Sequence, residues 1–483
     1  ILVGVDENRV ADEAIAMLPS LPNVYQRGRV LVQIVADAKP PKHLVRPDGG
    51  LQIVPIELAR LRELLTTGAV FLQPDSEGNT KPIHPPRWLP EAIQARHQWH
   101  SIPRLEGIVE VPVLFPDGSI LQKSGYDPAS GLFYQPAVKF DWVPEHPTKT
   151  EVERARDALL EVVVDFPFAA EEGPAAWLSG MLTPAARYAF ECPSPLFAFD
   201  ANVRGTGKTL LADAVGVVHS GRRIARTSAP KDDEECRKKI TSIALAGDPL
   251  VLIDNVAGTL GCPSLDAALT GTTWSDRILG KSKMTGSIPL NATWYASGNN
   301  LIFGGDTARR VLNIRIESWE EAPEERTGFQ HANLLDWVRQ NRGRLGAAVA
   351  TILRGYWAAD CPDMGLSEWG SFETWSRHVR NAVVWCGLPD PAATRQEFVA
   401  KADKNGNLLR MLIAGFEEAD PHRRGMLALE AIQRATEEPN ATLRAALSEI
   451  KPRGGELTAR SLGMKLHHFR KRVCGGKRFV DED

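Results

Sequence analysis

Short apolar runs separated by polar turns dominate the chain between residues 195 and 316. The runs lie at 195–199, 249–256, 292–300 and 311–316, and most of their positions show no alternation of apolar and polar residues. Runs of this kind are typical of strands buried on both faces, as in a parallel sheet covered by helices. Helical periodicity precedes them over 151–166 and follows them after residue 316. The pattern predicts an α/β core.

The two ends of the chain have other patterns. Strands are predicted at 30–35 and 107–114, and a helix at 56–65, so the first segment is expected to be a mixed α and β domain. Near the other end, 457–473 carries Leu462, Leu466 and Phe469 at helical spacing, followed by a glycine turn and a short basic strand. Helix, turn and basic strand together suggest a winged helix.

The first apolar run leads into a glycine-rich loop, ANVRGTGKT, and then into the start of a helix. Gly205 and Gly207 allow such a loop to fold back with its backbone N–H groups around a phosphate. Lys208 would then contact the β- and γ-phosphates, and Thr209 would offer its hydroxyl to Mg²⁺. The predicted nucleotide-binding residues are Asn202, Arg204, Gly205, Thr206, Gly207, Lys208, Thr209 and Leu210.

Asn202 stands where the motif GxxxxGK[ST] has its first glycine. Asparagine also tolerates a positive φ, so we expect the loop to be tightened differently rather than lost.

Two further runs end in polar residues. Asp254 lies at the end of the run at 249–256, where a carboxylate is needed to hold Mg²⁺ through water. The run at 292–300 ends in two amides, of which Asn299 is our first choice and Asn300 the second for orienting water and sensing the γ-phosphate. By itself, the run at 249–256 would be a buried strand that ends in an ordinary Asp-Asn turn.

Arg309 and Arg310 open the last of the four runs. An arginine at this place reaches across a subunit boundary and stabilises charge on the γ-phosphate of a neighbouring nucleotide. This predicts a ring. Taken alone, the two arginines would better fit a solvated or salt-bridged pair, and their fixed order after the three preceding motifs is what favours the role at a neighbouring nucleotide.

The series GTGKT, LVLIDNV, WSDRILG, ASGNN and GDTARRV, in this order, resembles the AAA+ helicase module of phage and plasmid primase-helicases, which is related to superfamily III viral replicative helicases. The resemblance covers about residues 150–385, with a weaker echo toward the C-terminus. It implies ATP and Mg²⁺ as cofactors and a homo-hexamer that moves along single-stranded DNA and unwinds forked duplex. A primase-polymerase domain is expected upstream in the same chain or in trans.

The resemblance implies an α/β AAA+ P-loop core with a helical lid, and together with the residue patterns above it gives the expected fold class, which adds an α+β N-terminal domain and a C-terminal winged helix. The expected domains are an accessory collar at 1–147, the ATPase core at 148–318, the lid at 319–388 and the DNA-binding domain at 394–483.

Asn255 departs from the family pattern, in which an acidic residue follows the magnesium aspartate and polarises water. An amide cannot act as a general base. Glu234 or Glu235, in the segment KDDEECRKKI, is a candidate substitute. Their alternative role is an acidic first turn that stabilises a helix.

Two basic segments are candidates for DNA contact. A hairpin at 274–290 would carry Lys281 and Lys283 at its tip, and in the resembled helicases a hairpin of this region enters the central channel. The segment 451–478 has nine Lys/Arg against one Glu, and the expected contacts are Arg470, Lys471, Lys477 and Arg478. Incidental lysines on an exposed turn and a solvated helix face are the alternatives.

Composition excludes several other classes. The chain has 483 residues, 43% of them hydrophobic, and a formal net charge of −3. We find no apolar run of about 18 residues and expect no membrane partner. Six scattered cysteines predict neither zinc nor a disulfide framework and fit a reducing bacterial host cytoplasm.

The predicted function is therefore an ATP-dependent replicative DNA helicase of a phage or mobile element. A non-catalytic, ATP-switched DNA-binding initiator or loader is the alternative that Asn255 keeps open. An ATPase of the same fold that remodels proteins or regulates transcription is a second alternative.

Overall fold

The computed structural model describes residues 1–36, 50–191, 193–277, 284–304, 306–320, 322–395, 404–437, 440–451, 456–470 and 476–480. They form two compact units, Ile1–Arg395 and Gln396–Asp483, each with a hydrophobic core of its own. Within these described ranges, no helix is both long enough and apolar enough to cross a bilayer.

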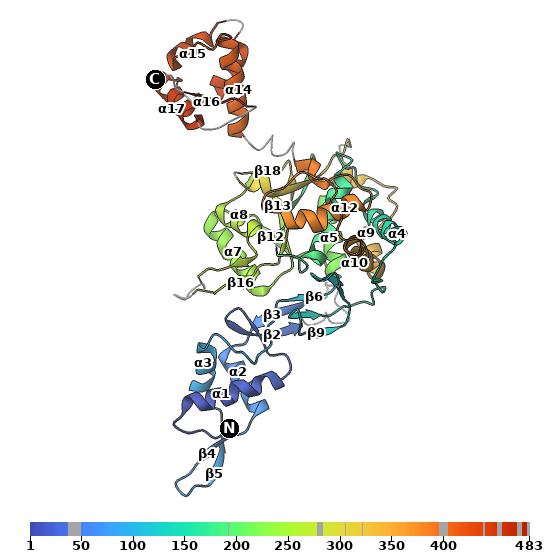
Figure 1. The fold of residues 1–483 in the computed structure, drawn as a ribbon, viewed down its shortest axis with the longest axis vertical. Coiled ribbons are helices and arrows are strands. Elements are labelled where there is room, and N and C mark those ends of the chain that lie inside the picture. Colours follow the sequence, from blue (N-terminus) through green and yellow to red (C-terminus); the bar gives the residue numbers. More distant parts are fainter. Residues whose placement is uncertain are drawn as a thin grey trace. The chain divides into compact units, whose positions relative to one another are not determined.

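A five-stranded parallel sheet forms the centre of the first unit (Figure 1). Its order is β12 (Arg226–Ser228), β13 (Leu250–Val256), β17 (Thr293–Asn299), β11 (Leu196–Ala201) and β19 (Val311–Ile316). Four of the five strands coincide with the apolar runs of the sequence, and only the short polar β12 does not, so the prediction of an α/β core with a parallel sheet is confirmed.

Helices flank this sheet and continue beyond it. The core contains α4 (Lys149–Leu160), α5 (Gly173–Ala186), α6 (Lys208–Ser220), α7 (Asp233–Ala246) and α8 (Pro263–Thr270). Further along lie α9 (Leu334–Gln340), α10 (Arg342–Ala358), α11 (Glu373–Trp375), a π-helical turn at Ser376–Arg380, and α12 (Asn381–Trp385). α4 begins where the sequence predicts because Thr148 and Glu151 cap each other's backbone N–H groups.

The N-terminal segment packs small sheets with short helices. It contains α1 (Glu7–Met17), β1 (Tyr25–Arg27), β2 (Val30–Ala36), β3 (Leu51–Pro55), α2 (Leu58–Gly68), β4 (Phe71–Pro74), β5 (Thr80–Ile83), α3 (Trp88–Ala95), β6 (Gly107–Val109), β7 (Val113–Leu114), β8 (Ile120–Leu121), β9 (Gly125–Asp127) and β10 (Leu132–Tyr134). The single strand predicted at 107–114 was wrong: β6 pairs with β10 and β7 with β8. Pro112, which has no N–H to donate, lies in the break.

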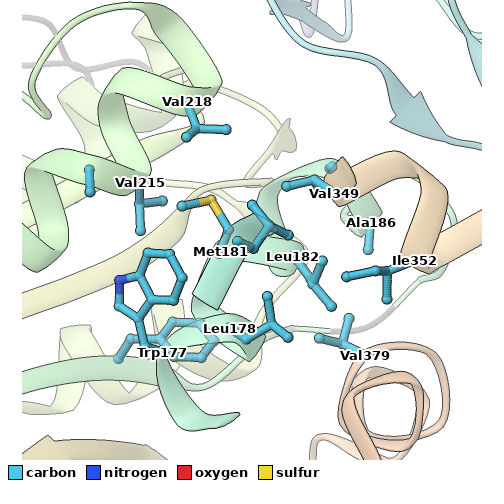
Figure 2. Packing of buried hydrophobic residues seen from close by; sticks show 14 of the residues in the cluster. Trp177, Leu178, Met181, Leu182, Ala186, Val215, Val218, Val349, Ile352 and Val379 are labelled. Atoms are coloured by element: carbon cyan, nitrogen blue, oxygen red, sulfur yellow. The ribbon is translucent and has the colours of Figure 1, made fainter. Parts of the chain in front are cut away.

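α5 runs through the main core and is buried on nearly all sides. Figure 2 shows its side chains packed among those of α6 and α10; the labelled residues are Trp177, Leu178, Met181, Leu182, Ala186, Val215, Val218, Val349, Ile352 and Val379. A helix without a polar face is stable only in such surroundings. This packing fixes α6, the helix that follows the predicted phosphate loop.

Pro184 lies inside α5 and has no N–H for the carbonyl of Gly180, four residues earlier. The hydroxyl of Tyr295, on β17, donates a hydrogen bond of 2.8 Å to that carbonyl. Burial raises the pKa of Tyr295 well above its ordinary value, so the hydroxyl keeps its proton. A side chain of the sheet therefore satisfies the helix carbonyl that proline leaves without a partner.

Tyr295→Phe is expected to lower the free energy of unfolding by about 1–3 kcal/mol, because it leaves a buried carbonyl without a donor. Chemical denaturation of the wild type and the variant measures this. In a Pro184→Ala background residue 184 regains its N–H, so Tyr295→Phe should cost much less. An equal loss in both backgrounds would contradict this account.

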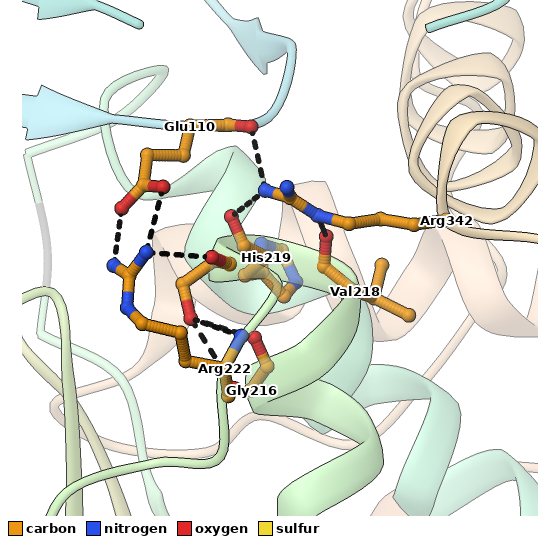
Figure 3. A network of polar contacts seen from close by, with 7 residues as sticks. Glu110, Gly216, Val218, His219, Arg222 and Arg342 are labelled. Atoms are coloured by element: carbon orange, nitrogen blue, oxygen red, sulfur yellow. Dashed lines mark hydrogen bonds and ion pairs between the residues drawn. The ribbon is translucent and has the colours of Figure 1, made fainter. Parts of the chain in front are cut away.

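The C-terminal end of α6 is held by two arginines and Glu110 (Figure 3). Arg342, on α10 and only 2% exposed, donates to the carbonyls of Val218 (3.0 Å), His219 (3.1 Å) and Glu110 (3.0 Å). The carboxylate of Glu110 accepts two hydrogen bonds from Arg222, at 3.0 and 2.5 Å. A cation at a helix C-terminus also interacts favourably with the helix dipole.

The second unit has four described helices of regular length: α14 (Lys404–Ala419), α15 (Ala428–Arg434), α16 (Ala441–Ile450) and α17 (Ala459–Phe469). α17 begins after a capping box between Thr458 and Ser461. It is shorter than the helix predicted at 457–473. Leu462 and Phe469 lie in the core of the unit, with Phe479 packed beside them. The wing, and with it the winged helix, stays a prediction.

Candidate functional site

The predicted phosphate loop joins β11 to α6. Every residue of β11 is buried, and the loop turns through Gly205 (φ +81°) and Gly207 (φ +86°). The positive φ of Gly205 favours glycine there, and a Cβ atom would also displace the Glu324 carboxylate, which lies 2.3 Å from its position. Gly207 occupies the N-cap position of α6 and has no side chain to cap it. The N–H groups of the first helical turn are therefore suited to binding an anion.

Asn202 closes the loop through its side chain. Its Nδ2 donates to the carbonyl of Ser318 (2.8 Å), and its Oδ1 accepts from the N–H of Ser318 (3.1 Å). Its φ lies outside the left-handed region, so the tolerance of asparagine for positive φ is not what it contributes. Two hydrogen bonds to the segment after β19 tighten the loop instead. Of the other predicted loop residues, Arg204 and Leu210 are exposed, Thr206 is buried and Thr209 is half-buried.

Lys208 and Asp254 lie within electrostatic range of each other at the carboxyl edge of the sheet. Lys208 is half-buried, and desolvation lowers the pKa of its ammonium, while Asp254 and Asp200 act in the opposite direction. Asp254 lies near the end of β13, where its Oδ1 accepts a hydrogen bond of 2.5 Å from the hydroxyl of Ser297 on β17. The sheet thus brings an ammonium and a carboxylate from distant parts of the sequence within electrostatic range.

Asn255 lies in an irregularity of β13, where the register with β17 shifts between Ile253 and Val256. Its φ is +54°, its side chain is exposed, and its N–H donates to the Ser297 hydroxyl (3.2 Å). Asparagine is one of the few residues that adopt this backbone conformation at modest cost. The position therefore has a structural reason to be asparagine.

Asn299 ends β17 directly beside the end of β11, with Ala201 as its register partner. Its Oδ1 is buried and has no hydrogen-bond partner among the described residues. Asn300 is already engaged: its N–H donates to Ala201 O (3.0 Å), its Nδ2 to Asn202 O (3.3 Å), and its Oδ1 accepts from Arg315 (3.3 Å). Of the two amides, Asn299 is the one with an acceptor to spare.

Glu234 and Glu235 lie in the first turn of α7, after the N-cap residue Asp232. Glu234 pairs with Lys238 (2.6 Å) and Glu235 with Lys239 (3.0 Å), each one helical turn later. Hydrogen bonds from the Lys231 N–H and from Lys239 lower the pKa of Glu235, which makes it a weaker base. These contacts account for both glutamates as parts of the helix start, and a role in catalysis stays a prediction.

Arg309 and Arg310 form a short 3₁₀ turn before β19. The Arg309 side chain is 61% exposed and pairs with Asp306. The Arg310 side chain is 20% exposed and lies 2.9 Å from the carboxylate of Asp266, on α8. Arg309 is thus the more accessible of the two to a neighbouring molecule, whereas Arg310 is held against α8 by its ion pair with Asp266.

Sequence reasoning missed Arg226, on β12. Its Nε lies 3.0 Å from Asp254 Oδ2, and its terminal nitrogen Nη2 lies 3.0 Å from Asp213 Oδ2, on α6. It also missed Ser297, which contacts both Asp254 and Asn255. A usable signal was present in the arginine-rich segment RRIARTS at 222–228, whose last three residues form β12 and pair with β13.

A cavity of about 330 Å³ adjoins the phosphate loop. It lies between the loop, the segment after α4 and the segment after β19. Its lining includes Phe166, Gly205, Thr206, Gly207, Leu210, Glu324, Arg326, Phe329 and His331. Its mixture of aromatic and polar groups beside the predicted phosphate loop suits a flat heteroaromatic ring joined to phosphates.

The predicted DNA-binding residues are only partly placed. Lys281, Lys283 and Lys471 lie outside the described residues. The base of the predicted hairpin is present as an antiparallel pair, β15 (Thr273–Trp274) and β16 (Ile288–Pro289). In the second unit, Lys477 pairs with Glu417 (2.7 Å), and Arg470 and Arg478 are exposed. Lys477 is therefore partly neutralised by its own unit.

The donor set at the sheet edge fits a magnesium nucleotide. The Thr209 hydroxyl and the Asp254 carboxylate are oxygen ligands of the kind Mg²⁺ accepts together with water and phosphate oxygens. Asn299 Oδ1, a buried acceptor without a partner among the described residues, suits the proton of a water molecule placed there.

Comparisons with known proteins found only limited similarity. No family model matches the chain, and no curated protein matches its sequence. Among solved structures, the chain resembles the apo form of the NrS-1 C-terminal region, with 12% identity over 84% of this chain and 92% of that chain and a TM-score of 0.39. It also resembles JCV helicase, with 14% identity over 50% of this chain and 74% of that chain and a TM-score of 0.22. Because the identities and TM-scores are this low, function is inferred from the chain's own residues.

Proposed function

We propose that this chain is an ATP-driven DNA motor, the helicase module of a phage or mobile-element replication protein. Two observations support the proposal: Asp254 acts electrostatically on Lys208, and β17 ends at Asn299 beside the end of β11, the strand that precedes the glycine loop and α6. Ligands of open α/β sheets bind at this edge. β17 also separates the phosphate-loop strand from the carboxylate strand, which agrees with the AAA+ resemblance.

The residues divide the work of ATP hydrolysis. The loop N–H groups and Lys208 bind the phosphates, and Thr209 and Asp254 hold Mg²⁺. When bound, Mg²⁺ would supply positive charge that neutralises the charge developing on the phosphates. Asn299 orients the attacking water through its buried Oδ1. The base of the nucleotide occupies the 330 Å³ cavity beside the loop, against Phe166 and Phe329.

A homo-hexameric ring would complete the site. Arg309 is exposed on the surface just before β19, where an arginine can reach the nucleotide of a neighbouring subunit. Lys281 and Lys283 are the proposed channel contacts with single-stranded DNA. Arg470, Lys471, Lys477 and Arg478 are proposed to contact forked DNA through phosphate.

A non-catalytic initiator or loader that closes on DNA when it binds ATP is the second candidate. Asn255 favours it, because its exposed amide follows Asp254 where a general base is expected. The lysine partners of Glu234 and Glu235 favour it as well, because they hold both carboxylates on α7.

Steady-state ATP hydrolysis by the full chain, with and without single-stranded DNA, tests the proposal. We expect DNA to stimulate turnover and Lys208→Ala to abolish it, since the variant loses the ammonium at the phosphates. ATP binding without turnover would instead support the loader. Turnover that DNA does not change would favour an ATPase that acts on proteins.

A further inference from the structure

Arg226 connects two carboxylates that belong to different elements of the core. Ser228 is the register partner of Asp254, so the side chain of Arg226 must extend along the strand to reach that carboxylate. It does so with its Nε 3.0 Å from Asp254 Oδ2, while its Nη2 lies 3.0 Å from Asp213 Oδ2. The Arg226 side chain is 43% exposed, and it therefore has room to change partner at the Asp254 end.

Both oxygens of Asp254 are engaged by this arrangement. Oδ1 accepts from the Ser297 hydroxyl and Oδ2 faces Arg226. A guanidinium and a divalent cation repel each other, so they do not share one carboxylate oxygen at contact distance. Any magnesium ion that Asp254 Oδ2 holds, directly or through a coordinated water, must therefore compete with Arg226.

Asp213 holds the end of the Arg226 side chain that is expected to stay in place. Its side chain is 1% exposed, and its other oxygen, Oδ1, has no hydrogen-bond partner in the described part of the chain. A buried carboxylate that lost its cation would be strongly destabilised, so Asp213 is expected to retain Arg226. Because Asp213 and Lys208 belong to the same helix, α6, this anchor moves with the phosphate-binding residues.

We propose that Arg226 is a positioning residue that changes partner with the nucleotide: it pairs with Asp254 until magnesium takes that carboxylate, and then turns to the terminal phosphate of ATP while Asp213 holds its other end. The inference rests on the proposed ATP-binding function and deepens it. Arginine suits this change of partner because its planar guanidinium group binds carboxylates and phosphates in the same two-bond geometry. ADP lacks the terminal phosphate and leaves Arg226 without a new partner. Arg226 thus favours the triphosphate.

Equilibrium binding of fluorescent ATP and ADP to the full chain, at a series of magnesium concentrations, tests this. For Arg226→Gln we expect the preference for ATP over ADP to fall about tenfold, because a charge-assisted contact with phosphate is lost. The magnesium concentration that half-saturates ADP binding should also fall, because the competitor of the metal is gone. Arg226→Lys keeps the charge without the fork and should change both quantities less, in the same direction.

Arg223→Gln is the matched control. Arg223 is 52% exposed and lies 3.7 Å from the same Asp213 oxygen, but Arg226 and not Arg223 contacts Asp254. It should leave the ATP preference and the magnesium dependence at their wild-type values.

The outcomes separate the inference from the proposed function. Wild-type protein that binds neither nucleotide would overturn both. Wild-type protein that prefers ATP, together with folded Arg226→Gln that keeps the same preference and magnesium dependence, would overturn the inference alone. Thermal unfolding shows whether each variant is folded, and Arg226→Lys supplies the comparison if the glutamine variant is not.

Discussion

Asp254→Asn is expected to lower magnesium-dependent ATP hydrolysis by about 100-fold or more. The amide keeps the size of the side chain and an acceptor for the Ser297 hydroxyl, but it removes the negative charge that holds the metal. Initial rates at saturating ATP across a magnesium titration measure the effect. Binding of ATP in the presence of a chelator should persist, because the phosphate loop and Lys208 do not depend on this carboxylate.

Asp157→Asn is the control for the loss of one aspartate. Its side chain is 63% exposed, it pairs with Arg156 on α4, and exposed pairs of this kind contribute little to stability. It should hydrolyse ATP at the wild-type rate. If Asp254→Asn were folded and equally active at low magnesium, Asp254 would not be a metal ligand, and another carboxylate would have to take that role.

Four strands of the core could be predicted because they are short apolar runs between glycine or polar turns, whereas β12 is short and polar. The apolar run before Asn202 became β11, and the runs that end in Asp254 and Asn299 became β13 and β17. Parallel strands align their carboxyl ends, so residues that follow separate strands were expected to meet. Lys208 and Asp254 do lie within electrostatic range of each other, although the roles of these residues stay predictions.

Contacts between residues that are distant in the sequence could not be predicted. Periodicity gives no sign that Asn202 bonds the backbone of Ser318, or that Tyr295 serves the carbonyl freed by Pro184. The salt bridge from Arg226 to Asp254 depends on β12 and β13 being neighbours, which the order of strands in the sequence does not state. Each of these contacts follows from strand order and packing rather than from local propensity.

The sequence pattern also left open which member of two adjacent pairs of residues serves the site, and the contacts in the structure now distinguish them. Asn299 and Asn300 are equivalent in sequence, but the sheet assigns Asn300 to the loop and leaves Asn299 Oδ1 without a partner among the described residues. Arg309 and Arg310 are likewise adjacent, yet the side chain of the first is 61% exposed and that of the second 20%. Burial and hydrogen bonding, which the sequence does not give, separate members of such pairs.

Arg342→Ala is expected to lower the free energy of unfolding by about 3 kcal/mol or more, the largest effect on stability that we predict. Arg342 is the donor for three backbone carbonyls, two at the end of α6 and that of Glu110 in the N-terminal segment. Alanine would leave these acceptors short of donors and open a cavity where the side chain was. Chemical denaturation followed by circular dichroism measures the change.

Arg344→Ala, two residues further along α10, is the matched control, because its side chain is 47% exposed and its partner is the half-buried Glu161 (3.2 Å). Exposed pairs contribute about 0–1 kcal/mol, so this variant should unfold almost as the wild type does. Equal losses in the two variants would mean that α10 packing, rather than the carbonyl contacts, anchors α6. Because α6 carries Lys208 at its other end, a loosened C-terminus should also weaken nucleotide binding in Arg342→Ala at temperatures where the protein is still folded. Unchanged affinity there would show that the phosphate loop is positioned by β11 and Asn202 without help from the far end of the helix.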